Sequence, residues 1–82
     1  MKVDHSRRQL VPNEVVGYMV KEALSPAAAW RKHLGLSEVQ VAERIGISQL
    51  AYAKHEKATN PSQATREKIA AALGIVPDLL DI

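Results

Sequence analysis

The stretch LSEVQVAERIGISQLAYAKHE, residues 36–56, carries the clearest structural signal in this chain. Ser37 and Gln40 stand three residues apart before an apolar run, which is the pattern of a capping box at a helix start. A second short helix follows, and Gly46-Ile47-Ser48 joins the two. Glycine adopts a positive φ at little cost, so Gly46 allows a sharp bend, and Ser48 caps the second helix. The pattern predicts two short helices over about residues 37–57.

Three side chains around this bend favour a helix-turn-helix motif. Ala42 lies four residues before Gly46, and its small side chain allows the two helices to cross closely. Ile47 and Tyr52 are expected to point back into the crossing. A motif of this kind presents its second helix, here Gln49 to about Lys57, to the major groove of DNA.

The rest of the chain also predicts short helices. Ser25-Pro26 caps and opens a helix that ends at Gly35, and Ser62 caps another that ends at Gly74. Asn13 is the expected N-cap of an earlier amphipathic helix, and Val76-Pro77 permits one last turn. No segment indicates a strand pair. The expected fold class is therefore all-α, with five to six short helices.

This pattern divides the chain into two parts. Residues 1–24 are expected to form an N-terminal arm and the extra amphipathic helix, and residues 25–82 a helix-turn-helix DNA-binding domain. The apolar positions of the extra helix are Val15, Val16, Met19, Val20 and Leu24. The core is expected to draw on all the helices: Val16, Val20, Trp30, Leu34, Val41, Ala42, Ile45, Ile47, Tyr52, Ile69 and Leu73.

Composition narrows the classes of function. A chain of 82 residues and 9.0 kDa fits one small domain rather than a large enzyme with a deep cleft. The absence of cysteine excludes disulfides, thiolate zinc sites and cysteine catalysis, and it fits a cytoplasmic protein. No run of about 18 apolar residues predicts a membrane span, and the first residues do not have the pattern of a signal peptide.

Charge favours a polyanionic partner, whereas the histidines do not favour a metal. The net charge is only +2, but residues 31–68 hold seven Lys and Arg against four Glu, a local +3. His5, His33 and His55 lack the spacing of metal ligands, and His55 is expected to be a partly buried packing residue. The serines are mostly helix caps, and no phosphate loop or carboxylate pair is present. We therefore expect no catalytic site, metal or cofactor.

Several motifs in register resemble those of the xenobiotic-response-element family of helix-turn-helix proteins, the Cro and phage-repressor type with a lambda-repressor-like fold. The resemblance covers residues 28–82. It includes WRKHLGLS at 30–37, VAERIGIS at 41–48, Glu56, NPS at 60–62 and KIAAALGI at 68–75. The segments VPNEVV at 11–16 and LSPAAAWRKHLGL at 24–36 are similar to one subgroup, the antitoxins that are paired with RelE/ParE-like toxins.

This resemblance implies a set of DNA-binding residues. Gln49 would read a base edge, Lys54 would reach a guanine or a phosphate, and apolar side chains would contact a thymine methyl. Phosphate contacts would come from the residues after the second motif helix and from the next helix N-terminus. The implied DNA-binding set is Ser48, Gln49, Leu50, Ala53, Lys54, Lys57, Thr59, Asn60 and Gln63.

The resemblance also implies one ion pair, and the chain departs from the family at one position. Similar proteins join an arginine and a glutamate at the positions of Arg31 and Glu56, which would fix the first helix of the domain to the end of the recognition helix. Many family members have glutamine where this chain has Glu38. A carboxylate there suits the positive helix terminus but opposes a phosphate. This carboxylate and a recognition helix with few side chains that can read a base edge together predict modest intrinsic specificity for DNA sequence.

Three functions remain open from the sequence. The first is a sequence-specific regulator that represses its own operon and neutralises a toxin. The second is a phage-type or host repressor without a toxin, and the third is a protein-interaction module of the same fold. The first two imply a homodimer on duplex operator DNA, with recognition helices about 34–36 Å apart. We expect the apolar contact between the two subunits to come from residues 15–24 or 79–82. The expected location is the cytoplasm, where the protein would be associated with the nucleoid through DNA binding.

Overall fold

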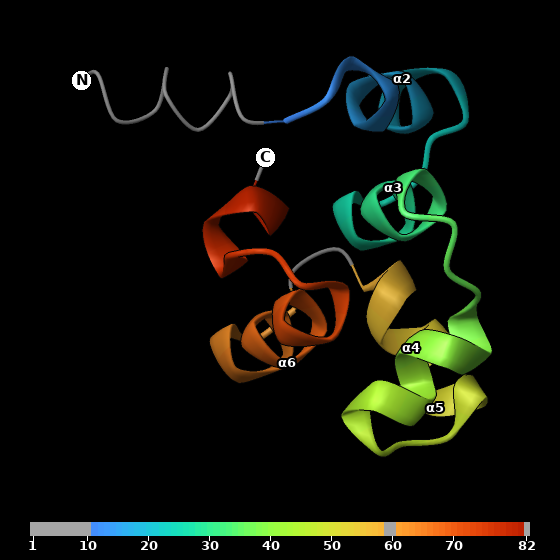
Figure 1. The fold of residues 1–82 in the computed structure, drawn as a ribbon, viewed down its shortest axis with the longest axis vertical. Helices are drawn as coiled ribbons and strands as arrows, with labels where there is room; N and C mark the ends of the chain where they lie inside the picture. The colour runs from blue at the N-terminus through green and yellow to red at the C-terminus, as the bar shows by residue number, and fades with distance from the viewer. Residues whose placement is uncertain (1–10, 59–60, 82) are drawn as a thin grey trace.

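The computed structural model describes residues 11–58 and 61–81. Within these ranges the chain forms α2 (Asn13–Lys21), α3 (Pro26–His33), α4 (Glu38–Ile45), α5 (Gln49–Lys57), α6 (Gln63–Leu73) and a final 3₁₀ turn, η1 (Pro77–Leu80) (Figure 1). The described residues contain no strand, so the all-α prediction is confirmed. No helix among them is long and apolar enough to cross a membrane. The arm expected at residues 1–10 lies outside the described ranges.

Serine hydroxyls begin the four helices from α3 to α6, as the sequence predicts. Each accepts a hydrogen bond from the backbone N–H three residues later, which satisfies a donor that the helix itself cannot pair. The capping box of α4 is complete, because the Gln40 side chain also accepts from the Ser37 N–H at 2.8 Å. Gly46 and Gly74 end α4 and α6 with φ values of 92° and 77°.

The start of α2 differs from the prediction. Asn13 lies inside the helix, and Pro12 occupies the N-cap position without a side-chain bond. The Pro12 carbonyl accepts instead from the N–H groups of Val15 and Val16, at 3.0 and 3.3 Å. Proline fixes φ near the value that the chain needs there, so the backbone begins this helix without a capping side chain.

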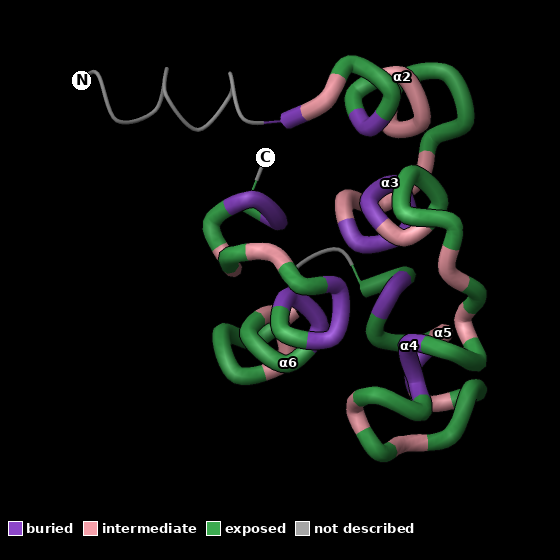
Figure 2. Tube along the Cα trace, viewed as in Figure 1, coloured by how far each residue is buried: buried purple, intermediate pink, exposed green. Residues whose placement is uncertain are grey.

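The core lies where α3, α4, α5 and α6 meet, and it extends to η1 and to α2. Figure 2 shows buried positions on the inner sides of these helices. Alanines let the helices approach closely, and among the larger side chains Tyr52, Ile69, Val15 and Val41 are fully buried. Trp30 joins α3 to η1, because its indole N–H donates to the Leu79 carbonyl at 3.1 Å. This bond satisfies a polar atom inside the core.

Three predicted core residues are exposed. Val16 and Val20 keep 45% and 76% of their surface because the buried face of α2 runs through Val15, Tyr18 and Met19. At 100° per residue, Val16 and Val20 point away from this face of the helix, whose main packing partner is α3. Leu34 is also exposed, because it lies at the C-cap of α3, where the chain turns away.

The two ends of the described chain supply core residues that the sequence analysis missed. Val11 is buried before α2, and Leu79 and Leu80 are buried in η1. The expected dimer contact at residues 79–82 is therefore wrong for both leucines, because their side chains stabilise the fold. Three alanines are buried as well: Ala27, Ala29 and Ala70. A small side chain gives no sign in the sequence that two helices pack closely at its position.

Candidate nucleic-acid interface

The bend between α4 and α5 is fixed by backbone hydrogen bonds to one residue. The N–H groups of Gly46 and Ile47 both donate to the Ala42 carbonyl, at 2.8 and 3.0 Å. The left-handed conformation of Gly46 makes this double contact possible. Ser48 then accepts from the Ala51 N–H at 3.1 Å and starts α5. The helix-turn-helix geometry expected from residues 36–56 is present.

The inner side of α5 is anchored by Tyr52 and Glu56. These residues lie one turn apart, on the side of α5 that meets the core, and both are buried. Tyr52 packs in the crossing with Val41 and Ala42, both buried on α4. The angle between α5 and α4 therefore depends on the packing around these two side chains.

The outer side of α5 carries the predicted reading residues. Gln49, Lys54 and Lys57 are exposed, and Ala53 is half-buried. Leu50 keeps 69% of its surface, so its side chain is available for contact with an apolar group outside the chain. Ser48 serves as the cap of this helix. The structure thus groups Ser48, Gln49, Leu50, Ala53, Lys54 and Lys57 on one short helix and its cap.

Glu38 contacts Gln49, the first of the predicted reading residues, and the sequence pattern does not predict this contact. The Gln49 Nε2 donates to Glu38 Oε1 at 3.3 Å. Both residues are the first in their helices, so the bend brings two helix starts side by side. A carboxylate can only accept, and this fixes which end of the Gln49 amide faces it.

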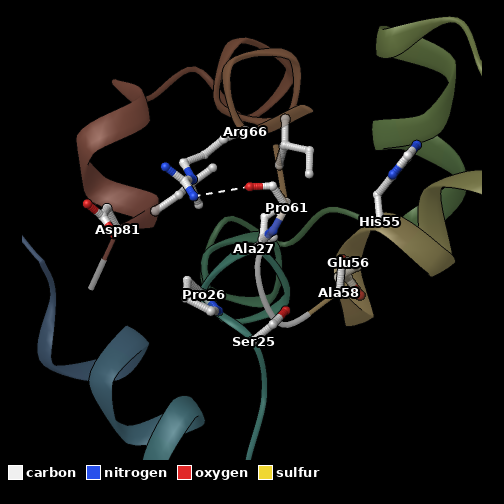
Figure 3. Close-up of a pocket in the computed structure, with 11 residues that line it drawn as sticks. Ser25, Pro26, Ala27, His55, Glu56, Ala58, Pro61, Arg66 and Asp81 are labelled. Atoms are coloured by element: carbon white, nitrogen blue, oxygen red, sulfur yellow. Dashed lines mark hydrogen bonds between the residues drawn. The ribbon is translucent and has the colours of Figure 1, made fainter. Parts of the chain in front are cut away.

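The segment that leads into α6 is held by Arg66. Its Nη2 donates to the Pro61 carbonyl at 3.2 Å, and its Nη1 lies 3.4 Å from Gln63 Oε1. Figure 3 shows Arg66 and Pro61 beside a cavity of about 190 Å³, with His55 on another wall. The amide of Gln63 also donates to Glu67, so its side chain is engaged within the helix. Thr59 and Asn60 lie outside the described residues.

The predicted pair of Arg31 and Glu56 is present and is bidentate. Arg31 Nε lies 2.7 Å from Glu56 Oε2, and Nη2 lies 3.1 Å from Oε1. A third bond, from Arg31 Nη1 to the Leu36 carbonyl at 3.0 Å, ties the pair to the segment before α4. One guanidinium thus connects α3, the α3–α4 turn and the end of α5.

The electrostatics of this pair keep Glu56 ionised. Burial is the largest single effect and opposes the charged form, but the hydrogen bond and the charge of Arg31, together with smaller contributions from neighbouring groups, outweigh burial and hold the pKa of Glu56 below its usual value. The same hydrogen bond raises the pKa of Arg31. Burial, and then the Glu56 carboxylate, raise the pKa of Tyr52. The Tyr52 hydroxyl makes no hydrogen bond of good geometry with the described residues.

This lowered pKa predicts a loss of stability in acid. The unfolded chain binds a proton at Glu56 near pH 4.3, while the native chain does so only at lower pH. The pair therefore stabilises the fold above about pH 4.3, and this contribution is lost as pH falls through the native pKa. Glu56→Gln should flatten the pH dependence of urea unfolding between about pH 5 and 3. Identical slopes for wild type and Glu56→Gln would contradict this, with exposed Glu43→Gln as the control.

The histidines do not form a metal site in the described part of the chain. No group of three or more His, Asp or Glu side chains there is placed to hold a metal ion. His33 stands edge-on to Trp30, with 6.0 Å between the ring centroids. The prediction for His55 is wrong, because this side chain is exposed where α5 faces the cavity. His5 lies outside the described residues.

A comparison with models of known protein families matches residues 28–80 to a model described as helix-turn-helix. This range spans more than half of the chain and includes α3 to α6 and η1. Neither a curated protein nor a solved structure gives a match.

Proposed function

This chain belongs to the Cro/C1-type helix-turn-helix family of DNA-binding transcriptional regulators, and from that membership we propose that it represses transcription by reading a specific operator through α5. The observation that carries the proposal is the division of α5 into two sides. Tyr52 and Glu56 hold one side in the core, while Gln49, Leu50 and Lys54 stand exposed on the other. We further propose that residues 25–82 form the DNA-binding domain and that residues 1–24 are appended to it.

Each exposed residue has a role in this proposal. Gln49 reads adenine, because Glu38 takes one N–H and leaves the second N–H and the carbonyl for adenine N7 and N6. Leu50 and Ala53 contact thymine methyl groups. Lys54 and Lys57, with Thr59, Asn60 and the backbone N–H groups at Gln63, contact phosphates. The Gln63 side chain is engaged by Arg66 and Glu67, so we assign its contact to the backbone.

Binding-site selection with wild type, Gln49→Ala and Lys54→Ala tests these roles. Gln49→Ala should relax preference at one base pair, at a cost of about 1–3 kcal/mol in discrimination. Lys54→Ala should weaken binding to all sequences about equally and reduce the salt slope by roughly one. If Gln49→Ala keeps full affinity and full sequence preference, the reading role of α5 is wrong. The exposed Lys21→Ala, on α2, is the matched control for charge.

We propose that the regulator binds as a homodimer, because one α5 supplies too few base contacts for useful specificity. The dimer places its two recognition helices about 34–36 Å apart. Of the two contact segments expected from the sequence, η1 has its leucines buried, whereas α2 leaves Val16 and Val20 exposed. Sedimentation of the free protein and of its operator complex measures this state directly.

We also propose an antitoxin role, in which the same chain neutralises a RelE/ParE-like toxin and represses the operon that encodes both. Figure 1 shows α2 and α5 at opposite ends of the molecule. A toxin bound at the α2 end of the molecule, beside the dimer contact proposed for Val16 and Val20, would therefore leave α5 free to remain on DNA. A toxin-sized open reading frame beside this gene separates this role from that of a plain repressor. A lack of salt-dependent retention on duplex DNA would favour the interaction module, which does not bind DNA, over both regulators.

A further inference from the structure

A groove with a basic rim runs between α4 and α6, and the DNA-reading role does not use it. It encloses about 530 Å³ and is lined by Arg44, Ile45, Lys68, Ala71, Ala72 and Gly74. It continues past Ile45 and Lys68 into a smaller hollow of about 160 Å³, beside Ile47 and His55. The residues on the floor of the groove are thus aliphatic or small, and the polar side chains at its edges are cationic or neutral.

The cations of this rim have no carboxylate partner among the described residues. Arg44 lies across the end of α6, where its Nη1 donates to the Ala72 carbonyl at 2.9 Å. Lys68 is exposed and has no ion pair within residues 11–58 and 61–81. Glu43 and Glu67 are their sequence neighbours, but neither lines the groove, and Glu67 accepts instead from Gln63.

Duplex DNA on the proposed interface would not cover this groove. The interface on α6 is its N-terminus at Gln63, whereas Lys68 and Ala71 lie five and eight residues further along. At 1.5 Å per residue these positions are about 7 and 12 Å away along the helix axis. The groove also presents an apolar floor, which a phosphate backbone does not match. The arm at residues 1–10 has the wrong charge for the rim, with three Lys and Arg against one Asp.

We propose that this groove binds an acidic, apolar segment of a protein partner, with an aliphatic side chain on Ile45 and Ala71 and flanking carboxylates on Arg44 and Lys68. The proposal goes beyond DNA binding and does not depend on it. Gly74 adds no side chain at this edge of the groove, so the aliphatic side chain of the partner can lie beside it. Exposed ion pairs are individually weak, so the contact is transient and sensitive to salt.

The test uses the full chain labelled with ¹⁵N and a short blocked peptide in which two glutamates flank each leucine. Addition of this peptide should shift the amide signals of Ile45, Ala71 and Gly74. A second peptide with serine in place of leucine should bind several-fold more weakly, and a third with lysine in place of glutamate should leave these signals unchanged. The separate addition of duplex DNA should shift Gln49 and its neighbours and not the groove.

Charge-reversal variants then test whether the peptide carboxylates contact the cations of the rim. Lys68→Glu should weaken the glutamate–leucine peptide roughly fivefold to tenfold, and Lys68→Ala by less. Lys21→Glu makes the same charge change on α2 and should leave peptide binding as in wild type. Equal binding of the lysine peptide, full binding by Lys68→Glu, or shifts at the groove caused by DNA would each overturn the proposal. Binding-site selection of Lys68→Glu should match wild type, so failure here is distinguishable from failure of the DNA-binding proposal.

Discussion

Glu56→Ala should lower the free energy of unfolding by about 3 kcal/mol, which for a domain of this size is a loss of roughly 12–24 °C in Tm. The substitution leaves the guanidinium of Arg31 without its bidentate acceptor and opens a space beside Tyr52 in the core. Removal of one partner of a buried ion pair usually costs about 3–5 kcal/mol, and we expect a cost at the low end of this range. The side chain of Arg31 keeps 20% of its surface, so water can compensate part of the lost contact. Thermal and urea unfolding measure the effect.

The matched control for this prediction is Glu43→Ala. Glu43 is an exposed glutamate on α4, and its removal should change stability by no more than about 0.5 kcal/mol. Equal melting temperatures for Glu43→Ala and Glu56→Ala would show that the ion pair does not stabilise the fold. Because Arg31 also holds the Leu36 carbonyl, Arg31→Ala should be at least as destabilising as Glu56→Ala.

Trp30→Ala should cost about 3–5 kcal/mol, the usual range for removal of a large aromatic side chain from a core. The indole is buried between α3 and η1, and its N–H satisfies the Leu79 carbonyl. The cavity would face η1, a single turn whose other main packing partner is α6. Urea unfolding followed by far-ultraviolet circular dichroism measures the loss without dependence on the indole itself.

Trp30→Phe separates the two contributions of this residue. Phenylalanine retains most of the apolar packing but leaves the Leu79 carbonyl without its donor, at a cost of about 1–3 kcal/mol. The aromatic control is Tyr18→Phe, which removes only a hydroxyl from a half-buried residue on α2 and should be close to neutral. If Trp30→Phe and Trp30→Ala are equally stable, the packing of the ring contributes less than its burial implies.

The local pattern of the sequence predicted the helices well, because their ends depend on neighbouring residues. Ser25, Ser37, Ser48 and Ser62 each bond a backbone N–H three residues away, and such contacts can be read from spacing alone. The wrong prediction of Asn13 as the N-cap of α2 also arises from this dependence on neighbouring residues. Both Pro12 and Asn13 are favourable at a helix start, and no local rule decides which of them is the cap.

The faces that the helices bury were harder to predict, because they depend on what packs against each helix. Val16 and Val20 are as apolar as Val15, but α2 packs mainly against α3, so one side of α2 stays uncovered. The same holds for His55, whose surroundings open into a cavity. The contact of Gln49 with Glu38 needs two residues eleven apart and the angle of the bend, which spacing alone does not supply.

For the interface, the resemblance placed the reading residues on one helix, and the fold does group them there. Whether each contacts a base or a phosphate stays a prediction. The pairing of Arg31 with Glu56, 25 residues apart, came from the resemblance and could not have come from composition or periodicity. The third contact of Arg31, with the Leu36 carbonyl, has no sequence signal, because any residue supplies a carbonyl.

The two-sided character of α5 also bears on how this regulator can change during evolution. Leu50 and Lys54 form no side-chain hydrogen bond with the described residues and contribute little to the core. Under the proposed roles, substitutions at Leu50 should therefore alter the preferred operator, and substitutions at Lys54 the affinity for DNA, while the protein remains folded. Tyr52 and Glu56, each two positions from Lys54 on the same helix, have no such freedom. Duplicated copies of this gene could diverge toward new operators by drift at a few neighbouring codons, with no compensating change elsewhere in the domain.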